Sequence, residues 1–107
     1  MQDKITRILK AIADPTRREI FHVLVVAATA LPITEISSKF DISRQGVTKH
    51  LRILEDAGLI GVSVKGRERY CLAKPKPLKE VNQWLKFYEQ FWDDSLDNLS
   101  SYLDTKA

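Results

Sequence analysis

The spacing of apolar residues changes abruptly at Gly58, and this change constrains the fold more than any other feature of the sequence. Through residues 43–57, apolar positions recur every three to four residues, which is the period of an α-helix with one buried face. Over residues 60–73 they alternate instead, on both sides of a Lys65–Gly66–Arg67 turn, as in a β-hairpin. Glycine is favoured just after a helix C-terminus. The sequence therefore predicts a helix followed directly by a hairpin.

The other predicted elements surround this pair. Asp14 is a natural N-cap and Pro15 suits the first position of a helix. Ser43 is the expected N-cap of the helix that ends near Gly58. Apolar spacing predicts helices over residues 1–13, from Pro15 onward, over 33–40 and over 78–103, with a turn at Leu31–Pro32. We therefore expect a mainly α fold with a β-hairpin: one winged helix-turn-helix domain over residues 1–107, with the helix-turn-helix at 33–57 and the wing at 60–73.

Length and composition exclude several classes of protein. The chain has 107 residues, about one domain, with 44% hydrophobic and 29% charged residues, as in globular proteins. Its longest apolar run, residues 23–31, is shorter than the roughly 20 residues that span a bilayer. The N-terminus lacks the pattern of a secretion signal. Cys71 is the single cysteine, so no internal disulfide can form. We expect a cytoplasmic protein without a membrane partner.

The net charge of +3 conceals an uneven distribution. Residues 1–79 hold 15 of the 17 Lys and Arg and 8 of the 14 Asp and Glu, a balance of +7. Residues 80–107 hold two bases and six acids, a balance of −4. This asymmetry predicts a polyanionic partner for the first part of the chain.

Long polar side chains gather on one face of the predicted helix that begins at Ser43. We call this set the recognition row: Arg44, Gln45, Thr48, Lys49 and Arg52. The B-DNA major groove admits one α-helix, and there Arg can bond guanine, Gln can bond adenine, and Thr can contact either. Gly46 is expected to let the helix approach the sugar-phosphate backbone. The Ser43 hydroxyl at the helix N-terminus is expected to hold a phosphate.

A second basic element follows at once. Lys65, Arg67 and Arg69 belong to the predicted hairpin, from which they could reach the DNA backbone or minor groove. A single basic helix face is as often a solvated surface as a binding site. Two basic elements next to each other favour binding to double-stranded DNA.

The segments "AIADPTRREIFHVL", "ITEISSKFDISRQGVTKHLRILEDAGLI" and "VKGRERYCL" resemble the ArsR/SmtB family of bacterial winged helix-turn-helix repressors over residues 5–103. The resemblance implies a homodimer in which the first and last helices pack together and two winged-helix units bind a palindromic operator. Matched residue by residue, it implies a recognition role for Ser43, Arg44, Gln45, Thr48, Lys49 and His50, and a wing role for Lys65, Arg67 and Arg69.

Metal-sensing members of the family carry ligands that this chain lacks. The soft ligands are limited to His22, His50 and Cys71, at unrelated positions, whereas a regulatory zinc site needs three or four converging ligands. We expect no metal and no other cofactor. His22 is expected to be a partly buried structural residue, and Cys71 a small buried hydrophobe, with a redox switch at Cys71 as an alternative. No nucleophile and base can be assembled, so an enzyme is not expected.

The last predicted helix has more apolar surface than one domain needs. Trp84, Phe87 and Phe91 form a second stripe beside one that includes Val81 and Leu85. We expect a two-fold dimer interface between the first and last helices, made by Ile5, Ile8, Ile12, Trp84, Phe87, Tyr88, Phe91 and Trp92. The alternative is that these aromatics complete the core. The acidic residues Asp93, Asp94, Asp97 and Asp104 are expected on the solvent face of this helix.

These observations predict a sequence-specific transcriptional regulator: a homodimeric repressor of an inverted-repeat operator, without a metal sensor. Two alternatives stay open. The regulator could respond to an organic effector, bound in a pocket beside the last helix, or to oxidation of Cys71. Alternatively, the chain could be a protein-interaction module on a winged-helix scaffold.

Overall fold

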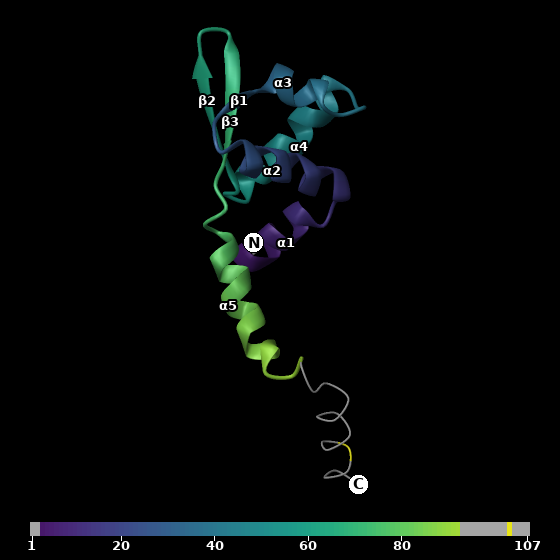
Figure 1. The fold of residues 1–107 in the computed structure, drawn as a ribbon, viewed down its shortest axis with the longest axis vertical. Helices are drawn as coiled ribbons and strands as arrows, with labels where there is room; N and C mark the ends of the chain where they lie inside the picture. Colours follow the sequence, from purple (N-terminus) through teal and green to yellow (C-terminus); the bar gives the residue numbers. More distant parts are fainter. Residues whose placement is uncertain (1–2, 93–102, 104–107) are drawn as a thin grey trace.

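The computed structural model describes residues 3–92 and residue 103. The elements, in chain order, are α1 (Lys4–Ile12), α2 (Pro15–Ala27), β1 (Leu31–Pro32), α3 (Ile33–Ser38), α4 (Arg44–Asp56), β2 (Ile60–Lys65), β3 (Glu68–Ala73) and α5 (Leu78–Glu89). Helices α1 to α4 and the small sheet form the body, and α5 extends away from it (Figure 1). The mainly α fold with a β-hairpin is confirmed.

The corner between α1 and α2 is fixed by the segment Asp14–Arg18. The Asp14 carboxylate accepts a hydrogen bond from the Arg17 backbone N–H at 2.9 Å and so caps α2, with Pro15 at its start. The Arg17 and Arg18 side chains turn back to the end of α1. There they donate to the carbonyl oxygens of Lys10, Ala11, Ile12 and Ala13. Cations and donors at a helix C-terminus satisfy carbonyls that have no partner within the helix.

The core lies where these helices meet the sheet. Its largest fully buried side chains come from every layer of the body: Ile8, Ile20, Leu24, Ile36, Val47, Leu54, Leu59 and Cys71. Cys71 is thus a small buried hydrophobe, as predicted. Ile8 was assigned to a dimer interface, and that assignment is wrong, because its own chain leaves it 0% exposed.

The sheet has three strands in the order β1-β3-β2, all antiparallel. The turn predicted at Leu31–Pro32 is instead a short edge strand, in which Leu31 pairs with Cys71. Proline is tolerated there because an edge strand does not need every backbone N–H. In the hairpin, Lys65 pairs with Glu68 across a two-residue turn, and Gly66 has a positive φ of 63° that favours glycine.

Helix α5 is anchored to the body through its first eight residues. Val81 is buried, and Leu78 and Leu85 pack against the core. Lys4 and Glu80 form an exposed ion pair of 3.0 Å between α1 and α5. No helix among residues 3–92 is long and apolar enough to cross a membrane.

The predicted single helix over residues 78–103 is interrupted. Gln90 donates a side-chain hydrogen bond of 2.8 Å to the Phe87 carbonyl, which in a continuing helix would accept from the N–H of residue 91. The Phe91 and Trp92 N–H groups bond three residues back instead, and residues 90–92 form a turn. The rest of the prediction, with Asp93, Asp94, Asp97 and Asp104, lies outside the described residues, except that Leu103 is helical.

Candidate nucleic-acid interface

Helix α4 begins and ends as its sequence predicts. The Ser43 hydroxyl oxygen accepts a hydrogen bond of 3.0 Å from the Gly46 N–H, which leaves its own hydrogen free to donate. A Cβ at residue 46 would lie 3.3 Å from that oxygen, so glycine also makes room for the cap. At the other end, the Gly58 and Leu59 N–H groups bond the carbonyls of Glu55 and Leu54, and Gly58 has a φ of 77°. This Schellman motif stops the helix before the wing.

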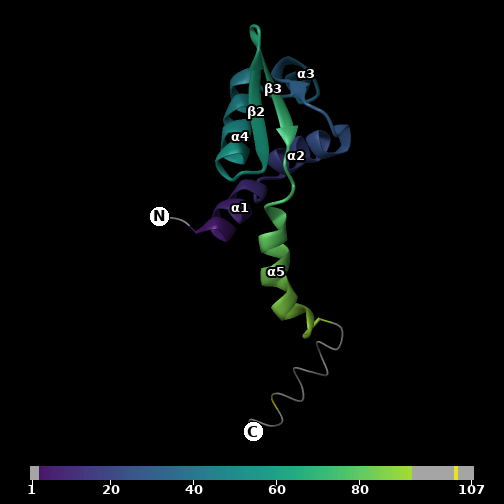
Figure 2. The ribbon, with the colours of Figure 1, turned by 90° about the vertical axis from the view of Figure 1, so that its left-hand side faces the viewer.

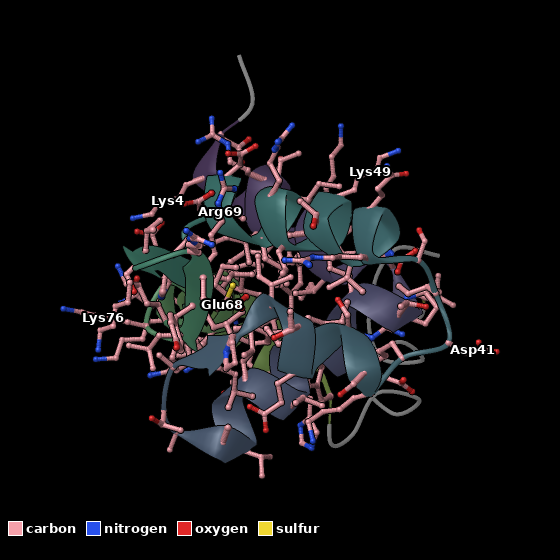
Figure 3. The ribbon with its side chains drawn as sticks, turned by 90° about the horizontal axis from the view of Figure 1, so that it is seen from above. Lys4, Asp41, Lys49, Glu68, Arg69 and Lys76 are labelled. Carbon is pink, nitrogen blue, oxygen red and sulfur yellow. The ribbon has the colours of Figure 1, made fainter. Side chains whose placement is uncertain are left out.

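The recognition row lies on the outer side of α4. Val47, Leu51 and Leu54 on the opposite side are at most 3% exposed, whereas four of the five side chains in the row are exposed and Thr48 is half-buried. Together the five line a shallow hollow of about 750 Å³. Figure 3 shows Lys49 pointing away from the body of the protein. The row is thus displayed to solvent by a helix whose other face is fixed in the core.

The wing places basic groups beside this hollow. Lys65, Arg67 and Arg69 are all exposed, and the hairpin tip extends beyond the helices (Figure 2). The Lys65 ammonium lies 5.9 Å from the centre of the Tyr70 ring, close enough for a cation–π contact. Helix α4 and the wing, two elements in contact, therefore both display exposed basic side chains.

Glu68 joins the two elements and was missed in the sequence. Its Oε1 atom lies 4.0 Å from Arg44 Nη2, so the first residue of β3 faces the first residue of α4. The sequence feature that could have identified Glu68 as a site residue is that it is the lone acid in the wing segment "KGRER". The contact between Glu68 and Arg44 could not be predicted, because the two residues are far apart in the sequence.

His50 does not stand in the recognition row. It is half-buried, and its Nδ1 lies 3.1 Å from the Arg17 guanidinium, which can only donate. In this contact Nδ1 must therefore be the acceptor, and the ring carries its hydrogen on Nε2. Arg17, a second missed residue, thus connects the end of α1 to α4. The only sequence feature that could have pointed to Arg17 is its place in the "DPTRR" segment.

The other potential ligand residues stand apart. His22 is exposed on α2, so the prediction that it is partly buried is wrong; Ile20, Phe21 and Leu24 occupy the inner face of that helix. Burial, with the nearby Glu55 charge as a second cause, raises the pKa of Cys71 to about 11. Its thiol therefore stays protonated and weakly reactive near neutral pH. Within the part of the chain that the structure describes, no three His, Cys, Asp or Glu residues gather as a metal site would require.

The predicted dimer surface differs between its two helices. On and just beyond α5, five aromatic side chains are between 42% and 61% exposed: Trp84, Phe87, Tyr88, Phe91 and Trp92. Neighbouring rings in this set contact one another at 5.1 to 5.9 Å between centroids. On α1, Ile5 and Ile12 are half-buried, and Ile12 packs against the core. We call the five aromatics the aromatic face; about half of its surface is exposed to solvent.

Comparison with known proteins agrees with this geometry. The helix-turn-helix domain family matches residues 12–62. The uncharacterized HTH-type transcriptional regulator YuzN of Bacillus subtilis is 39% identical over 80 residues, covering 69% of this chain and 86% of YuzN. The transcriptional repressor SdpR of the same organism is 29% identical over 92 residues, covering 86% of this chain and all of SdpR. A crystal structure of an ArsR family transcriptional regulator, RHA00566, has a TM-score of 0.74 at 31% identity, covering 84% of this chain and 91% of that one.

The fold, the exposed recognition row and these relatives define a transcriptional regulator with a helix-turn-helix DNA-binding domain. The relatives are regulators and not enzymes. Within that class, the chain belongs to the ArsR family of winged helix-turn-helix regulators.

Proposed function

We propose that this protein is a homodimeric repressor that binds an inverted-repeat DNA operator and works without a metal sensor. The observation that carries the proposal is the exposed recognition row of α4, opposite a fully packed face and next to a basic wing. The name of SdpR, a transcriptional repressor, supports the repressor role. We place the protein in the cytoplasm, where its operator would be.

The side chains divide into two roles. Arg44, Gln45 and Thr48 belong to the first two turns of α4, where a recognition helix reads base edges in the major groove. The remaining candidates position the protein on phosphates: Ser43, Lys49, His50, Arg52, Lys65, Arg67 and Arg69. His50 would take part through Nε2–H, since Nδ1 faces Arg17.

The aromatic face supports the dimer. Exposed apolar patches of this kind mark interfaces, and a two-fold interface pairs the same surface of two copies. We propose that it includes Trp84, Phe87, Tyr88, Phe91 and Trp92, together with Ile5 and Ile12. The dimer would place two recognition helices in successive major grooves about 34 Å apart. Sedimentation showing a folded monomer at micromolar concentration would contradict this part of the proposal.

The test of DNA binding is selection of bound sequences from a random duplex pool, followed by titration of Arg44→Ala and Gln45→Ala variants. We expect an enriched inverted repeat, and a loss of ~1–3 kcal/mol confined to particular base positions for each variant. Equal losses on selected and random DNA for Arg44→Ala would remove the base-reading role. A wild-type protein that enriches no sequence would favour the interaction-module alternative.

A groove on the body favours an organic effector as a second candidate function. It has a volume of about 910 Å³ and is lined mainly by apolar residues from α1, α2, the segment just after α3 and the start of α5, including Ile12, Phe21, Phe40 and Leu78. Pockets of this size and lining suit small molecules. A metabolite that raises the melting temperature and releases the selected DNA would establish this role, whereas stabilisation without release would not.

A further inference from the structure

One carboxylate at the junction of α4 and the wing has no part in the roles assigned above. Glu68 Oε1 is covered from solvent and has no hydrogen-bond partner among the residues that the structure describes. Arg44 Nη2 lies 4.0 Å away, which is too far for a hydrogen bond but close enough for charge attraction. Seen from above in Figure 3, Glu68 lies on the inner side of α4 and Lys49 on its outer side.

This position is unfavourable unless Glu68 gains a partner. A covered carboxylate oxygen loses hydration without a compensating hydrogen bond. The same negative charge, between Arg67 and Arg69 in sequence, also weakens the attraction of the wing for phosphate. Both penalties fall if the Arg44 side chain, which is 63% exposed and free to rotate, moves onto Oε1.

We propose that Glu68 is a positioning residue for Arg44, which sets the sequence specificity of the recognition helix. In the DNA complex the guanidinium of Arg44 donates to Glu68 with one edge and to a guanine with the other, because its five N–H donors lie in one planar fork. This inference rests on the proposed function. It adds that selectivity comes from a contact between the helix and the wing, not from the helix alone.

The pair affects two kinds of binding in opposite directions. Without the carboxylate, Arg44 loses its fixed orientation and binding to the selected sequence weakens. Without the negative charge, the basic surface attracts any phosphate backbone more strongly. Only the first change lowers the ratio of specific to non-specific affinity, because the second raises both affinities alike. Because the pair is partly exposed, we expect a decrease of roughly threefold to fivefold in that ratio.

The experiment measures affinities of the 107-residue chain for two duplexes: one selected by the wild type from a random pool, and a scrambled duplex of the same composition. Glu68→Gln keeps the shape of the side chain and removes its charge. The matched control is Glu55→Gln, which removes the same charge from an exposed position near the end of α4. We expect the ratio to fall for Glu68→Gln and to stay within twofold of the wild type for Glu55→Gln.

A double-mutant cycle separates positioning from a general effect on structure. In an Arg44→Ala background, Glu68→Gln should no longer change the ratio, although both affinities rise. If Glu68→Gln unfolds the protein, Glu68→Asp keeps the charge, withdraws the carboxylate from Arg44 and should lower the ratio to a similar degree.

The outcomes distinguish this inference from the proposed function. Suppose that the wild type selects a sequence but that Glu68→Gln and Glu55→Gln change the ratio of specific to non-specific affinity equally. This result overturns the positioning role of Glu68 and leaves the proposed function intact. The same holds if Glu68→Gln lowers the ratio equally with and without Arg44. A wild type that selects no sequence overturns both.

Discussion

Replacing Arg17 by Ala should be among the most destabilising single changes at a partly exposed site in this protein. The side chain makes three hydrogen bonds: to the carbonyl oxygens of Lys10 and Ala11 at the end of α1, and to His50 Nδ1 on α4. A hydrogen bond with a charged partner contributes about 1.5–3 kcal/mol where it is shielded from water and less where it is exposed. One of the three bonds is exposed, so we expect a total loss of about 3 kcal/mol.

The assay is urea unfolding, followed by circular dichroism at one fixed protein concentration, since the stability of a dimer depends on concentration. Arg18→Ala is the matched control, because Arg18 caps the same helix end through two exposed bonds and has no hydrogen bond to α4 among the described residues. We expect its loss to be about 1 kcal/mol. Equal losses for the two variants would refute the view that the contact between Arg17 and His50 supports α4.

Three further predictions concern single groups. The Arg17 backbone N–H lowers the pKa of Asp14 below its ordinary value of 3.8, so the stability from this group is present above pH 3.8 and is lost as the pH falls through the lowered pKa. As the pH is lowered, the Asp14→Asn variant should therefore lose less unfolding free energy than the wild type does, which an acid titration of stability measures. Lys65→Ala and Arg67→Ala should weaken binding to all duplexes alike and lower the salt slope by about one unit each; slopes unchanged from the wild type would remove the wing from the interface. Cys71, with its pKa raised to about 11, should react with a thiol reagent at pH 8 far more slowly in the folded protein than in urea, and equal rates would contradict its burial.

Local rules in the sequence predicted most of the fold. Caps at Asp14 and Ser43, the stop at Gly58 and the turn at Gly66 each depend on residues within one helical turn, and the structure contains all four. These features position α4 and the wing, so the recognition row could be assigned to an exposed surface before any coordinates were known.

The errors concern packing between distant segments. Helical spacing puts Ile5, Ile8 and Ile12 on one face of α1, but it does not say whether that face meets the core or a second copy. Apolar neighbours in sequence made His22 seem buried, although α2 turns it to solvent. The strand at Leu31 exists because Cys71 pairs with it from 40 positions away. Single-sequence patterns contain no information on such contacts.

The two missed residues share one physical role. Helix α4 is fixed by apolar packing on its inner face, but apolar packing does not determine rotation and sliding as strictly as directional bonds do. Arg17 contacts α4 through His50 near its middle, and Glu68 faces Arg44 at its first residue. Reading bases by hydrogen bonds requires donors held within about 0.5 Å of their working positions. A polar contact from α2 and another from the wing can supply this precision. It follows that losing the Arg17 contact should reduce specificity as well as stability, whereas losing the Glu68 contact should reduce specificity with little change in stability.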